Sequence, residues 1–490
     1  MNIALIKQIK IYILLAVLGI MLLNCEESLN GIEDPIESPT TEILNIPVPN
    51  TQDNLYSPML KVGWKGISQG SIIKGYWVSW KSHYLFLDKT IIQEKYFTNE
   101  VAQVIAFPSA DSINKQILYV KAEDQNGNID PIGDSVTFYT SRTLPPETVI
   151  EFPKNNSSAF IIDNTTITWK GVKIFVSGTS EFGELKDFAL QIDNNDWSEW
   201  QSDSLFFLNK NNVEGLTQGE HVIKVKSRNT ALVEDKTAAE IEINLVNASH
   251  EKEWLIIDDT KDQSGGIERP NDEQVDLFYN ELLAGIEHDN WDLTNDGVLT
   301  RELLGKYKYV LWHCDDNHQT SIPQMAGIIT DYLDTKGNFL LSGWNYMTYF
   351  DPEGDWADSV KYYGNILQDY FHINGFRTID DALLDSVYIR NSDNTASFAE
   401  IDTNKIWNFR NGLFKVTDYN NPGAFTESMF YYHAADTTDN NYMYSTIGMG
   451  YHNSEYRIVV AGFPFYYLTK ETAKLVFVRS KEYLETDFPF

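Results

Sequence analysis

Three short stretches decide the fold: WLIIDD at residues 254–259, YVLWHCDD at 309–316 and FLLSGWN at 339–345. Each stretch is apolar for three or four residues and then ends in polar or small side chains. Runs this short and this continuously apolar are typical of parallel strands buried on both faces. Helical periodicity separates them. The apolar positions at helical spacing are Val275, Phe278, Leu282 and Ile286 in one segment, and Ile322, Met325, Ile329 and Leu333 in the next.

This alternation of strands and helices predicts an α/β domain over residues 252–486, with an insertion at about 351–455. A strand over 456–461 and a final helix through Leu484 close the domain. In open α/β sheets, ligands bind at the carboxyl ends of the strands. We therefore expect any functional site of this domain to lie where the three apolar stretches turn polar.

Upstream, two copies of a β module are predicted over residues 43–142 and 143–248. Trp64-Lys65-Gly66 recurs as Trp169-Lys170-Gly171, and the distance from Trp64 to Val120 equals that from Trp169 to Val225. Strand-like runs separated by Gly, Asn and Asp turns fill both copies. The units resemble fibronectin type III or immunoglobulin-like sandwiches, which implies two all-β domains ahead of the α/β domain.

The N-terminus resembles a bacterial lipoprotein signal. Lys7 and Lys10 precede an apolar run over 11–23, which ends at Leu22-Leu23-Asn24-Cys25 as in a lipobox. The resemblance implies cleavage of residues 1–25 ahead of a lipidated Cys25, a solvated tether over 26–42, and an outer-membrane protein held only by its N-terminal lipid. An ordinary signal peptide with a chance cysteine is the alternative.

Charge and cysteine content restrict the partners and the chemistry. With 70 acidic and 38 basic residues the formal net charge is -32, so nucleic acid is not an expected partner. Cys314 is the second of two cysteines. If Cys25 carries lipid, Cys314 has no internal partner for a disulfide and the domains depend on their hydrophobic cores.

The α/β domain resembles the class I glutamine amidotransferase-like superfamily, which has a flavodoxin-like fold. The resemblance rests on the strand ends, on residues 337–343 and on Gly462-Phe463-Pro464. Active members place a nucleophilic cysteine in a turn that corresponds here to Gly343-Trp344-Asn345-Tyr346. An indole or an amide cannot be activated as a nucleophile. The resemblance therefore implies a domain that has lost the catalysis of the family.

Two enzymatic alternatives remain open. One is a hydrolase that uses Cys314 with His313 or His318 as a base. The other is a divalent cation, the only cofactor considered, held by Asp258, Asp259, Asp315 and Asp316. The same acids could instead be solvated or cap helices. Residues 292–303 echo an EF-hand loop but lack its final glutamate, and a turn with Asx hydrogen bonds explains them equally well.

The sequence therefore predicts a lipid-anchored envelope protein that binds a glycan or a protein partner and does not catalyse a reaction. A structural spacer is a further alternative. Aromatic and polar side chains near the strand ends are the expected binding surface. The predicted residues of this rim are Asp258, Asp259, Asp315, Asp316, Trp344, Asn345, Tyr346, Phe465 and Tyr466.

Overall fold

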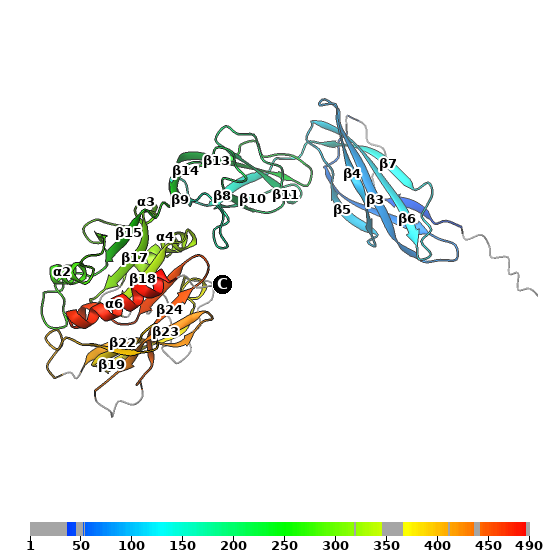
Figure 1. Ribbon diagram of the computed structural model, residues 1–490. Coiled ribbons are helices and arrows are strands. Elements are labelled where there is room, and N and C mark those ends of the chain that lie inside the picture. Colours follow the sequence, from blue (N-terminus) through cyan, green and yellow to red (C-terminus); the bar gives the residue numbers. More distant parts are fainter. Residues whose placement is uncertain are drawn as a thin grey trace, which may run out of the picture.

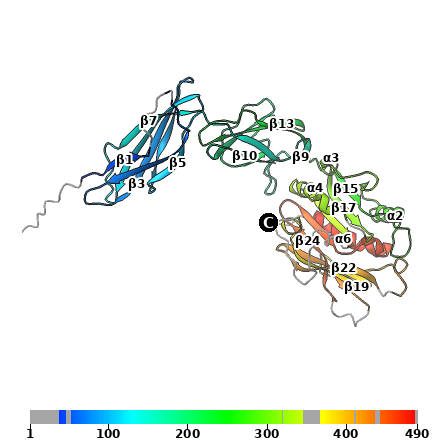
Figure 2. The same cartoon turned by 180° about the vertical axis from the view of Figure 1, so that it is seen from behind.

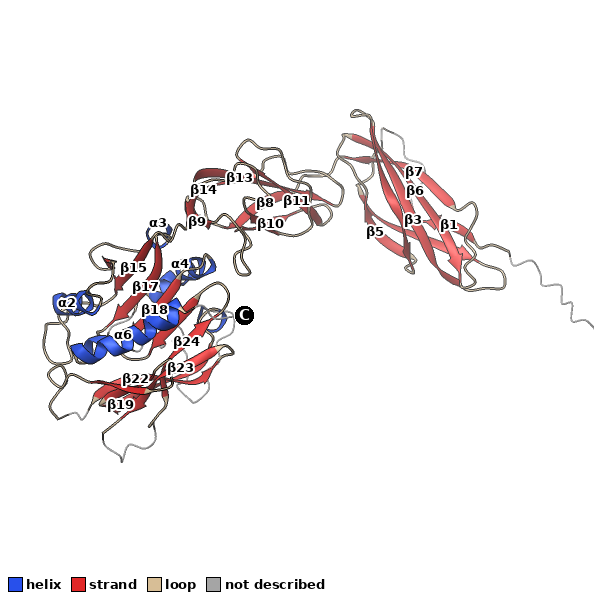
Figure 3. Cartoon of the chain, in the orientation of Figure 1, coloured by secondary structure: helices blue, strands red, loops and turns tan. Residues whose placement is uncertain are grey.

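Three bodies follow one another in the computed structural model, two β modules and a larger C-terminal domain (Figure 1). The view from behind shows the same succession (Figure 2). Helices occur in the C-terminal domain, whereas strands predominate throughout (Figure 3). The structure describes residues 37–45, 52, 54–317, 320–344, 366–409, 412–435 and 442–486. Of the predicted site residues, Cys25, His318, Asn345 and Tyr346 lie outside these ranges.

The first module is a sandwich of a three-stranded sheet, β1-β2-β5, and a four-stranded sheet, β4-β3-β6-β7. All of its strand pairs are antiparallel. Its strands are β1 (Thr40–Leu44), β2 (Met59–Ile67), β3 (Ile73–Tyr84), β4 (Lys89–Thr98), β5 (Ala102–Ala106), β6 (Ile113–Asp124) and β7 (Asp134–Ser141).

The second module repeats this division, with sheets β12-β10-β8 and β11-β13-β14-β9. Its edge strand β9 pairs with β14 in parallel. Its strands are β8 (Glu147–Phe152), β9 (Ser157–Ile161), β10 (Val172–Thr179), β11 (Leu185–Ile192), β12 (Leu205–Leu208), β13 (Gly219–Asn229) and β14 (Ala239–Asn247). Both modules are fibronectin type III or immunoglobulin-like sandwiches, as the sequence predicted.

The repeated tryptophans and valines explain why two distant segments fold alike. Trp64 and Trp169 are 1% and 7% exposed, and Val120 and Val225 are fully buried, so each copy places its repeated Trp and Val in its own core. The boundary ahead of the first module needs a correction. Strand β1 begins at Thr40, inside the segment that was predicted as tether, because residues 40–44 pair with β2.

The C-terminal domain is built on a nine-stranded sheet of order β16-β15-β17-β18-β25-β24-β23-β20-β21. The first five strands are parallel, and the pairs from β25 onward are antiparallel. These strands are β15 (Lys252–Asp258), β16 (His288–Asp292), β17 (Tyr307–Cys314), β18 (Asn338–Gly343), β20 (Ser386–Arg390), β21 (Ala396–Glu400), β23 (Thr426–His433), β24 (Thr446–His452) and β25 (Arg457–Ala461).

Alternate residues of the central strands enter two separate cores. Ile256 packs with helices α2 and α6 on one face, whereas Leu255 packs with α4 on the other. The prediction of parallel strands buried on both faces is thus confirmed for β15, β17 and β18. The helices are α2 (Asp272–Leu282), α3 (Arg301–Leu304), α4 (Ile322–Asp334), α5 (Ile366–Asp369) and α6 (Lys470–Glu485), with a 3-10 turn η2 (Phe465–Tyr467).

The predicted insertion contributes to the sheet itself. Four of its strands, β20, β21, β23 and β24, extend the parallel half, and β19 (Ile373–Leu384) pairs with β22 (Leu413–Pro422) as a separate antiparallel unit. The region is therefore part of the domain core and more than a connection placed over it. Because of these strands the domain is less helical than the three-layer α/β architecture that the sequence suggested, and that finer assignment remains a prediction.

The second module and the C-terminal domain share a hydrophobic core. Phe160 of β9 and Val246 of β14 belong to the same buried cluster as the β15, β17 and α4 side chains. The backbone of His250 donates to Gly305 O over 2.9 Å, which fastens the connecting segment to the end of α3. Among the described residues, no helix has the length and apolar character needed to span a membrane.

Candidate functional site

The predicted rim aspartates do meet at the carboxyl ends of β15 and β17, but they are buried. Asp258 and Asp259 are 4% exposed, and Asp315 and Asp316 are 0% and 1% exposed. The aromatic members of the predicted rim are buried as well, since Trp344, Phe465 and Tyr466 are all at most 8% exposed. The prediction of an open binding surface made by these described residues is therefore wrong.

The rim is closed because segments distant in sequence lie over it. Strand β22 crosses the end of β25, where Thr417 N donates to Gly462 O over 2.7 Å. A Cβ at Gly462 would come within 2.4 Å of Thr417 O, so a glycine is required for this close approach. Phe414 of the same strand packs on Trp344 with ring centroids 4.8 Å apart.

Asp259 caps helix α4. Its Oδ2 accepts hydrogen bonds from Thr320 Oγ1 at 2.6 Å and Ser321 N at 2.7 Å, and its Oδ1 accepts from Ser321 Oγ at 2.8 Å. The indole of Trp312 donates to the same carboxylate over 3.3 Å. Of the two roles considered for this acid, capping is the one that the contacts support.

Asp315 and His313 form a second buried network. The Asp315 carboxylate accepts from Tyr279 Oη at 3.0 Å and Tyr466 N at 3.2 Å, and it lies 2.9 Å from His313 Nδ1. Burial opposes a charge on His313, but the Asp258 and Asp315 carboxylates outweigh it and raise the pKa of the imidazole. These contacts fix the side chains in place and leave Asp315 without a face turned to solvent.

Cys314 does not have the environment of a nucleophile. Its side chain is fully buried, and its Sγ lies 3.9 Å from both the backbone and a carboxylate oxygen of Asp316. Burial, followed by the Asp259 and Asp315 carboxylates, raises the pKa of the thiol well above its usual value. His313 directs its Nδ1 to Asp315 and not to the Cys314 sulfur.

The EF-hand-like loop at residues 292–303 uses its acids internally. Asp292 Oδ1 accepts from the backbone of Thr294 at 2.7 Å and of Asn295 at 3.2 Å, and Asp296 Oδ2 accepts from Asp292 N at 3.0 Å. These are the hydrogen bonds of an Asx turn. They account for the sequence pattern without a bound ion.

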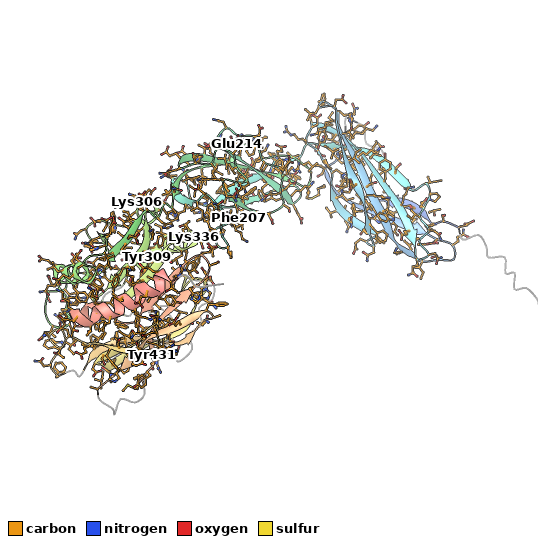
Figure 4. The ribbon with its side chains drawn as sticks, in the orientation of Figure 1. Phe207, Glu214, Lys306, Tyr309, Lys336 and Tyr431 are labelled. Atoms are coloured by element: carbon orange, nitrogen blue, oxygen red, sulfur yellow. The ribbon has the colours of Figure 1, made fainter. Side chains whose placement is uncertain are left out.

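A large cleft lies elsewhere, between the second module and the C-terminal domain. Its volume is about 940 Å³. One wall is the outer face of the sheet β12-β10-β8, where Leu205, Phe175 and Phe152 are paired across three strands. Phe152 and Phe175 are 46% and 42% exposed, although they are large apolar side chains. Phe207 adds a further ring on the side that faces the C-terminal domain (Figure 4).

The opposite wall supplies polar groups from α3, α4 and the residue after α5. Arg301 Nε donates to Asp331 Oδ2 over 2.9 Å, and Tyr370 Oη donates to Asp334 Oδ2 over 3.0 Å. Burial raises the pKa of Asp334 to about 6, although its hydrogen bond from Tyr370 acts in the opposite direction. An apolar wall facing a few fixed polar groups at a domain junction is a usual form of ligand site.

Sequence reasoning missed this cleft. Phe152 and Phe175 lie side by side only because of the register of β8 against β10. The polar wall belongs to another domain. Neither wall therefore forms a motif in the sequence. One signal was available. Phe175 alternates with Ile174 and Val176 in a strand-like run, which places an aromatic residue on the face opposite the core.

Comparison with known proteins finds solved β modules that are similar at low identity and low TM-score, and these likenesses carry no argument. No family model matches the chain, and no curated protein matches it. Similar solved structures include fibronectin(III)-like modules of Clostridium thermocellum CbhA, at 12% identity over 42% of this chain and 95% of that one (TM-score 0.19). A two-domain fibronectin type III segment of chicken tenascin matches at 10% identity over 42% and 99% of the two chains (TM-score 0.16).

A β-galactosidase from the haloarchaeon Halorubrum lacusprofundi matches at 12% identity and a TM-score of 0.31, over 48% of this chain and 30% of the enzyme. Likenesses this weak carry no argument about activity. Each module consists of a three-stranded and a four-stranded sheet, and this makes it a β-sandwich. The lipoprotein and amidotransferase-like resemblances stay predictions.

We expect Asp259→Ala to lower the free energy of unfolding of the C-terminal domain by about 3 kcal/mol, because it leaves the start of α4 uncapped and several buried donors unsatisfied. Urea unfolding followed by tryptophan fluorescence measures the change. Asp262→Ala, on an exposed position of the neighbouring loop, serves as the control and should change stability by less than about 0.5 kcal/mol. Equal stability of the two variants would contradict the capping role.

Asp334 should make the protein less stable as the pH rises. The pKa of Asp334 is higher in the folded protein than in the unfolded chain, so the folded state holds the proton more tightly. The stability that the protonated carboxyl contributes is fully present below the unfolded pKa. It is lost as the pH rises through the folded pKa of about 6. We expect Asp334→Asn to be more stable than wild type by about 2 kcal/mol near pH 8 and roughly equal to it near pH 4. Urea unfolding at both pH values, with the exposed Asp381→Asn as control, checks this difference.

Proposed function

We propose that the protein is a lipid-anchored receptor of the bacterial envelope that binds a carbohydrate chain and has no catalytic activity. The observation that carries the proposal is the cleft beside β10, where exposed phenylalanine rings face Arg301 and two acids. Aromatic faces pack against the C–H groups of a sugar ring, and charged side chains hydrogen-bond to its hydroxyls. This cleft replaces the closed strand ends as the proposed binding site.

The absence of catalysis is supported by the surroundings of the candidate groups. Cys314 is buried with a raised pKa, and all four rim aspartates accept hydrogen bonds from neighbouring backbone or side-chain donors. Neither of the hydrolases considered from the sequence is favoured by these contacts. A pure spacer would not require large apolar side chains such as Phe175 and Phe152 to stand exposed beside a cleft.

The amidotransferase-like resemblance is retained as a proposal about the fold. In chain order the five parallel strands are β15, β16, β17, β18 and β25, and their spatial order corresponds to 2-1-3-4-5. That is the strand order of flavodoxin-like sheets, which supports the fold that the resemblance implies. In the proposed scheme this domain supplies the polar wall of the cleft.

The cleft predicts a specific loss of carbohydrate binding. Phe175→Ala should weaken binding about fivefold, since one stacked ring contributes about 1 kcal/mol, and Phe175→Ala with Phe207→Ala should weaken it further. Phe86→Ala removes an exposed ring from the first module, away from the cleft, and is the control. A glycan array identifies the ligand, and titration calorimetry with the three variants measures affinity. Unchanged affinity in the double variant would rule out the cleft.

The anchor predicts that the protein partitions with membranes through one residue. Cys25→Ser should abolish incorporation of labelled fatty acid and shift the protein from the membrane fraction to the soluble fraction. Cys314→Ser removes the other cysteine and keeps Cys25, so it should leave the label and the fractionation unchanged. Labelling that persists in Cys25→Ser would show that the lipobox resemblance is accidental.

A further inference from the structure

Three carboxylates gather at the end of β15, next to the network of His313 and Asp315. Asp258 is the last residue of β15, and Asp272 and Asp276 lie one turn apart at the start of α2. One oxygen of each carboxylate lies within 4.8 Å of the corresponding oxygens of the other two. Asp258 is buried, whereas Asp272 and Asp276 are half-buried, so the cluster is reached from solvent along the helix.

The hydrogen bonding of this cluster is incomplete. Asp258 is 4% exposed, and its Oδ1 accepts from Thr260 N at 2.7 Å. Its Oδ2 is buried without a hydrogen-bond donor among the described residues, and so is Oδ1 of Asp272. A buried carboxylate oxygen that lacks a donor costs free energy. Two other rim acids differ in this respect, since Asp259 and Asp315 accept hydrogen bonds from several donors.

We propose that Asp258, Asp272 and Asp276 bind a hard divalent cation of the size of Ca²⁺. Carboxylate oxygens are the ligands that Ca²⁺ prefers, at about 2.3–2.6 Å, and three oxygens within 4.8 Å of one another can reach one such ion. The cation satisfies the oxygens that lack donors. It also joins the end of β15 to the start of α2.

Three carboxylates this close together repel one another. The His313 imidazole lies 3.5 Å from Asp258 Oδ1. Either a cation or a retained proton relieves the repulsion that remains among the three acids. The two alternatives differ in their response to added calcium.

The test uses the full-length chain, depleted of metal with EDTA and then given calcium or magnesium chloride at about 1 mM free ion. Thermal unfolding followed by circular dichroism should show an increase in melting temperature of about 5–10 °C with calcium, if the ion is present at about a hundred times its dissociation constant. Calorimetric titration with calcium chloride should give one site per chain.

Asp272→Asn and Asp276→Asn should each abolish the calcium-dependent shift. Asp276→Asn is the safer variant, since Asp272 is the first residue of α2 and has a buried Oδ1. Asp296→Asn, in the EF-hand-like loop, and the exposed Asp381→Asn should retain the shift. The proposal is overturned if wild type shows no shift, if both cluster variants keep it, or if Asp296→Asn alone removes it. Stabilisation of Asp272→Asn in EDTA, without any calcium response in wild type, would identify a shared proton instead.

Discussion

The architecture of the C-terminal domain depends on burying both faces of its parallel strands. Once Leu255 and Ile256 point into different cores, β15 cannot be shifted by one residue without exchanging those cores. The strand ends are thereby fixed in position. The acids that follow must then be accommodated inside the protein, where each needs hydrogen-bond donors. Asp259 and Asp315 obtain them from α4 and from Tyr279, whereas Asp258 does so only in part.

The sequence predicted those features that depend on local pattern. The repeated Trp64 and Trp169 revealed two β modules, and the apolar runs at Trp254 and Tyr309 revealed buried parallel strands. The capping role of Asp259 was among the alternatives from the start. These features depend on the periodicity of a single segment or on residues close to it along the chain.

Features made by distant segments could not be predicted in this way. Trp344 was placed on an open rim because its own turn follows a strand, but Phe414, far along the chain, covers it. The partnership of Asp258 with Asp272 requires knowledge of how α2 meets the sheet. To predict that Phe175 lies beside Phe152, one must know the register between β8 and β10. Tertiary packing, which no local pattern encodes, decided each of these positions.

Phe160 and Val246 insert the second module into the core of the C-terminal domain. Pulling the two apart would therefore expose apolar surface to water, as unfolding does, so the pair resists stretching as one mechanical unit. In the proposed function, a molecule bound in the adjacent cleft would touch both bodies, and its binding free energy would add to that resistance.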